Sequence, residues 1–173
     1  MLQVPITLED TLLTTGLRID QLIEYWHERH PWNDYNNQQT AADIVSKVID
    51  YIKRDGVPML GVLEALECCR NDGYKIGLAA SSSMNLADAV LDKFQIRHNF
   101  LSIQSAEHLK YGKPHPEVYL NCADALKVAP TQCLAIEDSF NGLIAVRAAN
   151  MQTVAISPKE QQHLKNGMLL IIK

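Results

Sequence analysis

Several features that would place the chain in a specialised class are missing from its 173 residues. The formal net charge is −4, so there is no polybasic surface of the kind that binds nucleic acid or anionic membranes. No apolar run comes near the length of a membrane span, about 18 residues. The N-terminus also lacks the basic start and apolar core of a signal peptide. We therefore expect neither nucleic acid nor a membrane as a partner.

The four cysteines show no metal-binding spacing, and two of them, Cys68 and Cys69, are adjacent. Adjacent cysteines rarely form an ordinary structural disulfide with each other, so we expect reduced thiols and a cytoplasmic protein. Internal repeats and low-complexity tracts are missing too. The remaining composition, 47% hydrophobic and 21% charged, is that of a globular protein large enough for one sizeable core.

Residues 1–57 show helical periodicity alone. Two sets of apolar residues, separated by a turn-rich break at 31–37, repeat at i, i+3, i+4 and i+7: Ile19, Leu22, Ile23 and Trp26, then Ala41, Ile44, Val45, Val48 and Ile52. His27 and His30 are three residues apart, whereas the helix of a zinc protease carries its histidines four apart. Surface histidines are the better interpretation of that pair.

After residue 57 strand patterns alternate with helix patterns, and we place a domain boundary there. The expected strands are residues 74–80, 100–103, 133–136, 153–156 and 168–172, and helices are expected over residues 61–71, after the serines at 81–83, after Pro116 and after Ser139. Such alternation predicts a parallel sheet connected by right-handed crossovers. The fold class is therefore α/β, with a Rossmann-like core over residues 58–173.

Two adjacent carboxylates, Glu137 and Asp138, end the apolar run at 133–136, and Ser139 is typical of a helix N-cap. The carboxyl ends of parallel strands are where open α/β sheets bind ligands. Hard oxygen ligands at such a place suit Mg²⁺. A solvated acidic turn explains this stretch alone equally well.

Lys113 precedes a helix and is followed by two prolines that fix the backbone. A cation held rigidly there can neutralise a phosphoryl group, although a single lysine is more often a surface residue. The run Ser81-Ser-Ser83 follows another strand and could offer N–H groups to a phosphate, although a plain helix cap explains the run alone better. Combined with Lys113 and the two acids, the serines favour phosphate binding.

The combination of Lys113-Pro-His-Pro116 with Glu137-Asp-Ser139 resembles the third and fourth motifs of haloacid dehalogenase-like phosphatases. Further stretches resemble the β-phosphoglucomutase-like branch, in particular phosphatases of 2-deoxyglucose 6-phosphate and hexitol phosphates: Thr15-Gly-Leu-Arg-Ile-Asp20, Pro31-Trp32, Leu78-Ala-Ala-Ser-Ser82, Ser105-Ala-Glu107 and Val118-Tyr-Leu120. The resemblance implies a three-layer α/β core, with residues 1–57 as a helical cap that closes over the substrate.

The resemblance also implies roles for individual residues. Arg18 would lie on the cap face that meets a sugar phosphate, and Ser81 and Ser82 would lie in the phosphate-binding loop. Lys113 would steady the transferring phosphoryl group. Asp138, together with Glu137, would hold Mg²⁺ and so take part in catalysis.

Two departures from the family pattern bear on activity. The family's nucleophile comes from an Asp-x-Asp-Gly motif at the end of its first strand, and no such motif occurs in this sequence. We expect a chain truncated at its N-terminus, without the strand that would lie between residues 74–80 and 133–137, and inactive for that reason. Ala80 also stands where the family has Ser or Thr, and Ser81 comes one residue late.

The leading hypothesis is a Mg²⁺-dependent phosphatase by descent that acts on a hexose 6-phosphate, 2-deoxyglucose 6-phosphate or a hexitol phosphate. A sugar phosphomutase of the same branch is the second enzyme hypothesis. A non-catalytic module that binds sugar phosphates is the third, and binding without turnover would distinguish it.

Overall fold

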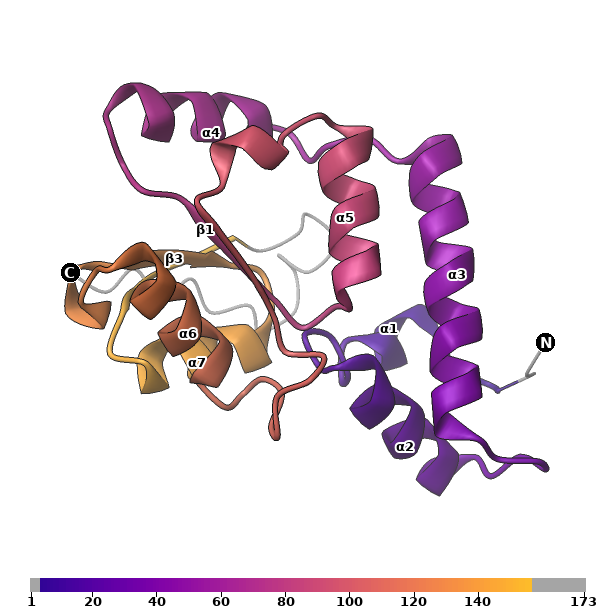
Figure 1. The fold of residues 1–173 in the computed structure, drawn as a ribbon. Helices are drawn as coiled ribbons and strands as arrows, with labels where there is room; N and C mark the ends of the chain where they lie inside the picture. Colours follow the sequence, from indigo (N-terminus) through magenta and orange to yellow (C-terminus); the bar gives the residue numbers. More distant parts are fainter. Residues whose placement is uncertain (1–3, 157–173) are drawn as a thin grey trace.

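The computed structural model describes residues 4–156 of the chain (Figure 1). Its elements in order are α1 (Leu8–Thr11), α2 (Ile19–Arg29), α3 (Asn37–Asp55), α4 (Val62–Asn71), β1 (Gly77–Ala80), α5 (Met84–Lys93), η1 (Arg97–Asn99), β2 (Ser102–Ser105), α6 (Glu117–Leu126), η2 (Pro130–Gln132), β3 (Leu134–Glu137), α7 (Phe140–Ala148) and β4 (Gln152–Ala155). Over these residues no helix has the length and apolarity that crossing a membrane requires.

Of the helices before residue 57, α2 and α3 pack on each other, and α3 also packs on the helix that follows β1. Asn36 caps α3 by accepting a hydrogen bond from the N–H of Gln39 at 3.0 Å, and α3 packs against both α2 and α5. Figure 1 shows α3 and α5 side by side. No strand occurs in residues 4–57, and the division into a cap and a core at residue 57 stays a prediction.

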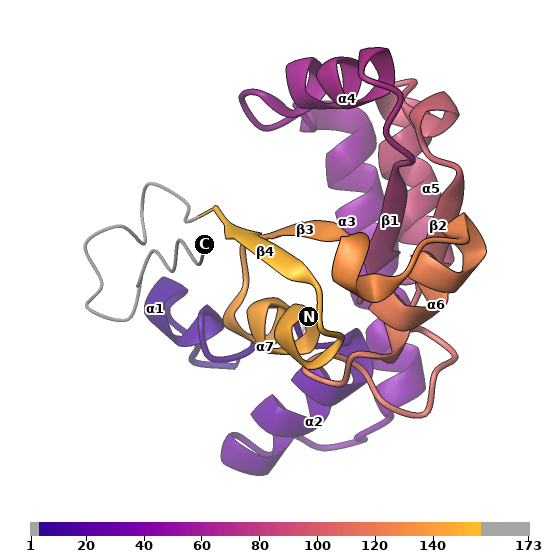
Figure 2. The ribbon, with the colours of Figure 1, turned by 90° about the vertical axis from the view of Figure 1, so that its left-hand side faces the viewer.

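The described strands form two parallel pairs, β1 with β2 and β3 with β4. In the first pair Leu78 lies opposite Ile103, and in the second Ile136 lies opposite Val154. In the view of Figure 2, β3 lies between β4 and β1, yet β1 and β3 share no ladder. The predicted α/β fold with parallel strands is confirmed. The expectation from the family resemblance that a further strand belongs between β1 and β3 stays a prediction.

Each strand pair is covered by one helix. α6 packs on β1 and β2, and α7 packs on β3 and β4. A Cβ atom on Gly77 would meet the side chain of Leu126 at 3.1 Å and that of Cys122 closer still, so glycine lets α6 approach β1. The main buried cluster lies between the two helices and the loops beside them: Ala106, Val118, Tyr119, Ala123, Ala145, Val146, Ala149 and Met151.

The predicted strands differ from the observed ones by one to three residues at their ends. β1 begins at Gly77 rather than at residue 74, and the ammonium of Lys75 donates to the carbonyl of Leu126 at 2.8 Å. The apolar run at 133–136 predicts a buried parallel strand, and this prediction is wrong on one face: Leu134 and Ile136 are 60% and 57% exposed in the described residues. The predicted strand at 168–172 lies outside the described residues.

Candidate functional site

A buried ion pair joins the loop before α6 to the end of β3. The Nζ atom of Lys113 lies 2.5 Å from Oε1 of Glu137, and the two residues are only 6% and 8% exposed. The sequence places both residues at the carboxyl edge of the strands, because Glu137 ends β3 and Lys113 lies between β2 and α6. Burial alone raises the pKa of Glu137, but the nearby Lys113 charge and three hydrogen bonds lower it overall, below its usual 4.5.

Two further residues complete the surroundings of the Glu137 carboxylate. The hydroxyl of Tyr119 donates a hydrogen bond to Oε1. The hydroxyl of Ser139 donates to Oε2 at 3.1 Å, and its backbone N–H points at the same oxygen from 3.4 Å. Burial first, and then the negative charge of Glu137, raise the pKa of Tyr119 well above its usual range, so it stays a protonated donor. Both carboxylate oxygens are therefore fully engaged.

Ser139 acts at the same time as the predicted helix N-cap. Its Oγ accepts a hydrogen bond from the N–H of Gly142 at 3.1 Å while donating to Glu137. A Cβ atom on Gly142 would lie 2.6 Å from Oε1 of Glu137 and closer still to its other carboxylate atoms. The first turn of α7 therefore fixes the position of the carboxylate.

The turn around residue 16, between α1 and α2, reaches over this edge of the strands. The hydroxyl of Ser81 donates to the carbonyl of Gly16 at 2.8 Å, and the side-chain amide of Asn141 donates to the carbonyl of Thr15 at 3.1 Å. Ser81 thus follows β1, as predicted, and faces the same segment as Ser139. The hydrogen bonds described above do not link Ser81 to Lys113. That the two residues bind the same phosphate therefore remains a prediction.

The other serines of the run are engaged in local contacts. The carbonyl of Ser82 accepts a hydrogen bond from the Ser105 hydroxyl at 2.6 Å. The N–H of Met84, at the helix start where the phosphate-binding interpretation needs free N–H groups, donates to the carboxylate of Glu107 at 3.0 Å. Ser83 is the N-cap residue of α5, and within residues 4–156 its buried Oγ has no hydrogen-bond partner.

Arg18 lies where the chain passes from the α1 region into α2, and it holds the loop after β2. One terminal nitrogen donates to the carbonyls of Ala106 and Leu109, at 3.1 and 2.6 Å. The other two guanidinium nitrogens form a bidentate pair with Asp20, at 2.6 and 2.7 Å. This pair lowers the pKa of Asp20 and raises that of Arg18. The predicted contact of Arg18 with a sugar phosphate would require it to exchange some of these partners.

The predicted Mg²⁺ ligands differ in how available they are. Asp138 is exposed, whereas both oxygens of Glu137 are occupied by Lys113, Tyr119 and Ser139. In the part of the chain that the structure describes, no group of three or more His, Cys, Asp or Glu side chains is placed to hold a metal ion. Asp138 fits a metal site; Glu137 fits one only if its present partners move.

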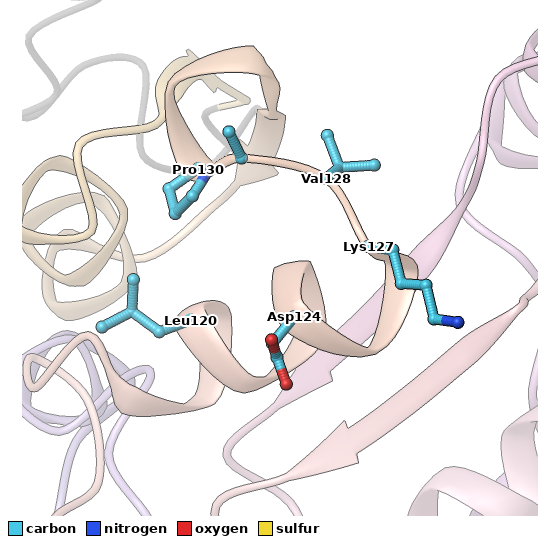
Figure 3. A pocket seen from close by; sticks show the side chains of 6 residues that line it. Leu120, Asp124, Lys127, Val128 and Pro130 are labelled. Atoms are coloured by element: carbon cyan, nitrogen blue, oxygen red, sulfur yellow. The ribbon is translucent and has the colours of Figure 1, made fainter.

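Two surface hollows lie elsewhere. One, of about 410 Å³, is lined by residues of α6 and the turn after it, including Leu120, Asp124 and Lys127 (Figure 3). Another, of about 540 Å³, lies between α3 and α5. None of the predicted site residues lines either hollow.

Comparison with known proteins fits this arrangement. The profile of the haloacid dehalogenase-like hydrolases matches residues 2–156, and the chain belongs to that family. It is 39% identical to hexitol phosphatase B of Escherichia coli over 160 residues, which are 92% of this chain and 72% of that protein. It is 37% identical to the E. coli fructose-1-phosphate phosphatase YqaB over 81 residues, 47% of this chain and 43% of that protein.

A solved structure, a β-phosphoglucomutase from Clostridium difficile, superposes with a TM-score of 0.74 at 28% identity, covering 91% of this chain and 73% of that one. The resemblance to the β-phosphoglucomutase-like branch, and to hexitol phosphatases within it, is thereby confirmed.

Sequence reasoning missed two residues of the site, Tyr119 and Gly16. The helical periodicity places Tyr119 on the inner face of its helix, but it does not identify the partner of the Tyr119 hydroxyl.

Proposed function

We propose that this chain carries the cap and the phosphate-positioning half of a site for small sugar phosphates: a hexose 6-phosphate, 2-deoxyglucose 6-phosphate or a hexitol phosphate. The observation that carries the proposal is the buried Lys113–Glu137 pair beside the exposed Asp138 at the carboxyl edge of β3. The names of the two curated relatives, a hexitol phosphatase and a fructose-1-phosphate phosphatase, support this class of substrate.

Within the proposed site, Lys113 neutralises a phosphoryl oxygen, because it is the buried cation nearest the acids at this edge. Ser81 and Ser82 supply polar groups from the loop after β1. Arg18 contributes from the helical side, exchanging its carbonyl partners for the phosphate or hydroxyl groups of a sugar.

Mg²⁺ is the cofactor that this donor set suits best, with Asp138 as the protein ligand that is free to reach it. When bound, the ion would neutralise charge on the phosphoryl group. The carboxylate of Glu137 is occupied by Lys113 and Ser139, so Glu137 supports the metal site indirectly, by holding these two residues in place. The described cysteines are free thiols, which favours a reducing compartment such as the cytoplasm.

We further propose that the 173 residues alone do not turn substrate over. Attack on phosphorus by this route needs a carboxylate nucleophile, and the sequence has no Asp-x-Asp-Gly segment to supply it. Ala80, at the end of β1, offers no hydroxyl where a serine or threonine would reach the phosphate.

The test is a turnover assay of the purified chain, with Mg²⁺ and a panel of hexose and hexitol phosphates, followed by the same assay on a fusion that carries an Asp-x-Asp-Gly strand ahead of Met1. We expect no turnover from the chain alone and measurable phosphate release from the fusion, increased by Ala80→Ser. Release of the isomeric sugar phosphate instead would identify a mutase.

Matched variants make the assay specific. Asp138→Asn and Lys113→Met should abolish turnover by the fusion, whereas Asp124→Asn and Lys110→Met, at exposed positions outside the site, should not. Turnover by the unfused chain that disappears in Asp138→Asn would show that these residues form a complete site and would refute the proposed inactivity. Turnover by the fusion that survives both site variants would refute the site itself.

A further inference from the structure

Tyr119 is a buried ionisable residue to which the proposed function gives no role. It is 6% exposed and lies in the first turn of α6, six residues after Lys113. It touches both members of the ion pair: its hydroxyl donates to Oε1 of Glu137, and its ring centre lies 4.7 Å from Nζ of Lys113. One side chain therefore contacts the cation through its π face and the anion through its hydroxyl.

Oε1 of Glu137 accepts from Lys113 and Tyr119 together. If Lys113 turns its ammonium toward a phosphate oxygen, it gives up part of its bond to that atom. A buried carboxylate that loses its donors is strongly destabilised. Here Tyr119 stays on Oε1 and Ser139 stays on Oε2, so the carboxylate remains hydrogen-bonded after the lysine has turned.

We propose that Tyr119 is a positioning residue for Lys113. Its ring holds the ammonium at the edge of the strands, and its hydroxyl keeps Glu137 satisfied while the lysine engages an oxyanion. The second half of this inference rests on the proposed phosphate-binding role of Lys113; the first half does not.

The experiment compares the ammonium group of Lys113 in the unaltered chain and in Tyr119→Phe, which keeps the ring and removes the hydroxyl. The protein is labelled with ¹⁵N in its lysine side chains, and the Lys113 signal is assigned by its loss in Lys113→Arg. Two quantities are measured: the rate of hydrogen exchange of the ammonium, and the concentration of inorganic phosphate that shifts its signal half-way.

We expect exchange to be slower in Tyr119→Phe, because Glu137 without the tyrosine hydroxyl depends more on Lys113. For the same reason the phosphate concentration should rise by about fivefold to tenfold, the effect of one hydrogen bond. Tyr111→Phe is the matched control on the preceding loop, where the ring is 49% exposed. Leu91→Ala, a truncation in α5 at a residue 1% exposed, controls for a general loss of stability. Both controls should leave the Lys113 signal unchanged.

The inference would be overturned if Tyr119→Phe had the same ammonium exchange rate, and the same half-way phosphate concentration, as the unaltered chain. If phosphate does not move the Lys113 signal even in the unaltered chain, the phosphate role fails at this residue. The exchange rates then still decide whether the Tyr119 hydroxyl shares the Glu137 carboxylate with Lys113. Should Tyr119→Phe not fold, the unaltered chain gives the answer: the methylene protons beside Nζ should be shifted upfield by the Tyr119 ring, and an ordinary shift would refute the contact.

Discussion

Gly16 lies directly against Ser139, the residue that caps α7 and donates to Glu137. Gly16 has a φ of +85°, and a Cβ atom built on it would lie 2.8 Å from Cβ of Ser139 and closer still to its Oγ. The carbonyl of the same glycine accepts from Ser81. The turn before α2 thus closes over the ends of β1 and β3 at a point where no side chain fits.

Gly16→Ala should therefore destabilise the chain on two counts. An L-residue at this φ is strained by about 1–2 kcal/mol, and the new methyl group must displace Ser139 as well. Gly61→Ala is the control, since Gly61 has the same conformation, φ +86°, with nothing within 4 Å of the added methyl group. We expect Gly16→Ala to lower the free energy of unfolding, measured in urea, by at least about 1 kcal/mol more than Gly61→Ala does. Equal losses would contradict the contact with Ser139.

Gly142→Ala tests the contact between α7 and Glu137. Alanine in place of a helical glycine ordinarily stabilises by about 1 kcal/mol. Here the added methyl group would overlap the Glu137 carboxylate, so the sign should reverse, with a loss of about 1–3 kcal/mol in urea unfolding. In a Glu137→Ala background the obstacle is gone, and the same substitution should then be stabilising; a loss in both backgrounds would show that Glu137 is not the obstacle.

The sequence predicted the local structure around the site residues better than it predicted which side chains contact one another. The N-cap of Ser139 and the strand that ends at Glu137 follow from short-range rules, namely the preference for serine at a helix start and the apolar run before the acids. The identity of the group that Glu137 binds depends on the approach of the loop that holds Lys113, 24 residues upstream, and no spacing rule predicts that approach. The pairing with Lys113 is therefore a result of the structure alone.

The exposure of β3 shows a second limit. An apolar run predicts burial on both faces of a strand, but burial depends on what packs on each face. Ala135 and Glu137 face α7 and the site, whereas Leu134 and Ile136 point away from them. Arg18 shows a similar limit. The family resemblance places it near the site, but the resemblance does not predict its hydrogen bonds to the carbonyls of Ala106 and Leu109.

The Arg18–Asp20 pair predicts a dependence of stability on pH. The hydrogen bond from Arg18 holds the pKa of Asp20 below its usual 3.8, so the pair stabilises the folded chain above that pH and loses its effect as the pH falls through the lower, folded pKa. The stability difference between the unaltered chain and Asp20→Asn should be constant above about pH 5 and shrink below about pH 4. Because Asp20 is 43% exposed, the difference should be modest. Urea unfolding at several pH values measures it, and a difference that grows on acidification would contradict the pair.

Replacing one or the other member of the buried Lys113–Glu137 pair should lower the free energy of unfolding by different amounts. Glu137→Met leaves Lys113 buried with only the Tyr119 ring against its ammonium, and removing one partner of a buried pair typically costs about 3–5 kcal/mol. Lys113→Met leaves Glu137 with the donors of Tyr119 and Ser139 in place, so its cost should be clearly smaller. The double variant removes both charges, and we expect it to be no less stable than Glu137→Met alone.

Urea unfolding of the two single variants and the double variant measures the coupling within this pair. Arg97→Met, which removes an exposed partner of Asp88, is the control for loss of a surface ion pair and should change stability little. The order of the two single variants is decisive, because the hydroxyls of Tyr119 and Ser139, together with the Ser139 N–H, make the lone carboxylate easier to bury than the lone ammonium. A greater loss for Lys113→Met than for Glu137→Met would mean that these hydroxyls do not support Glu137, and the role inferred for Tyr119 would fail with them.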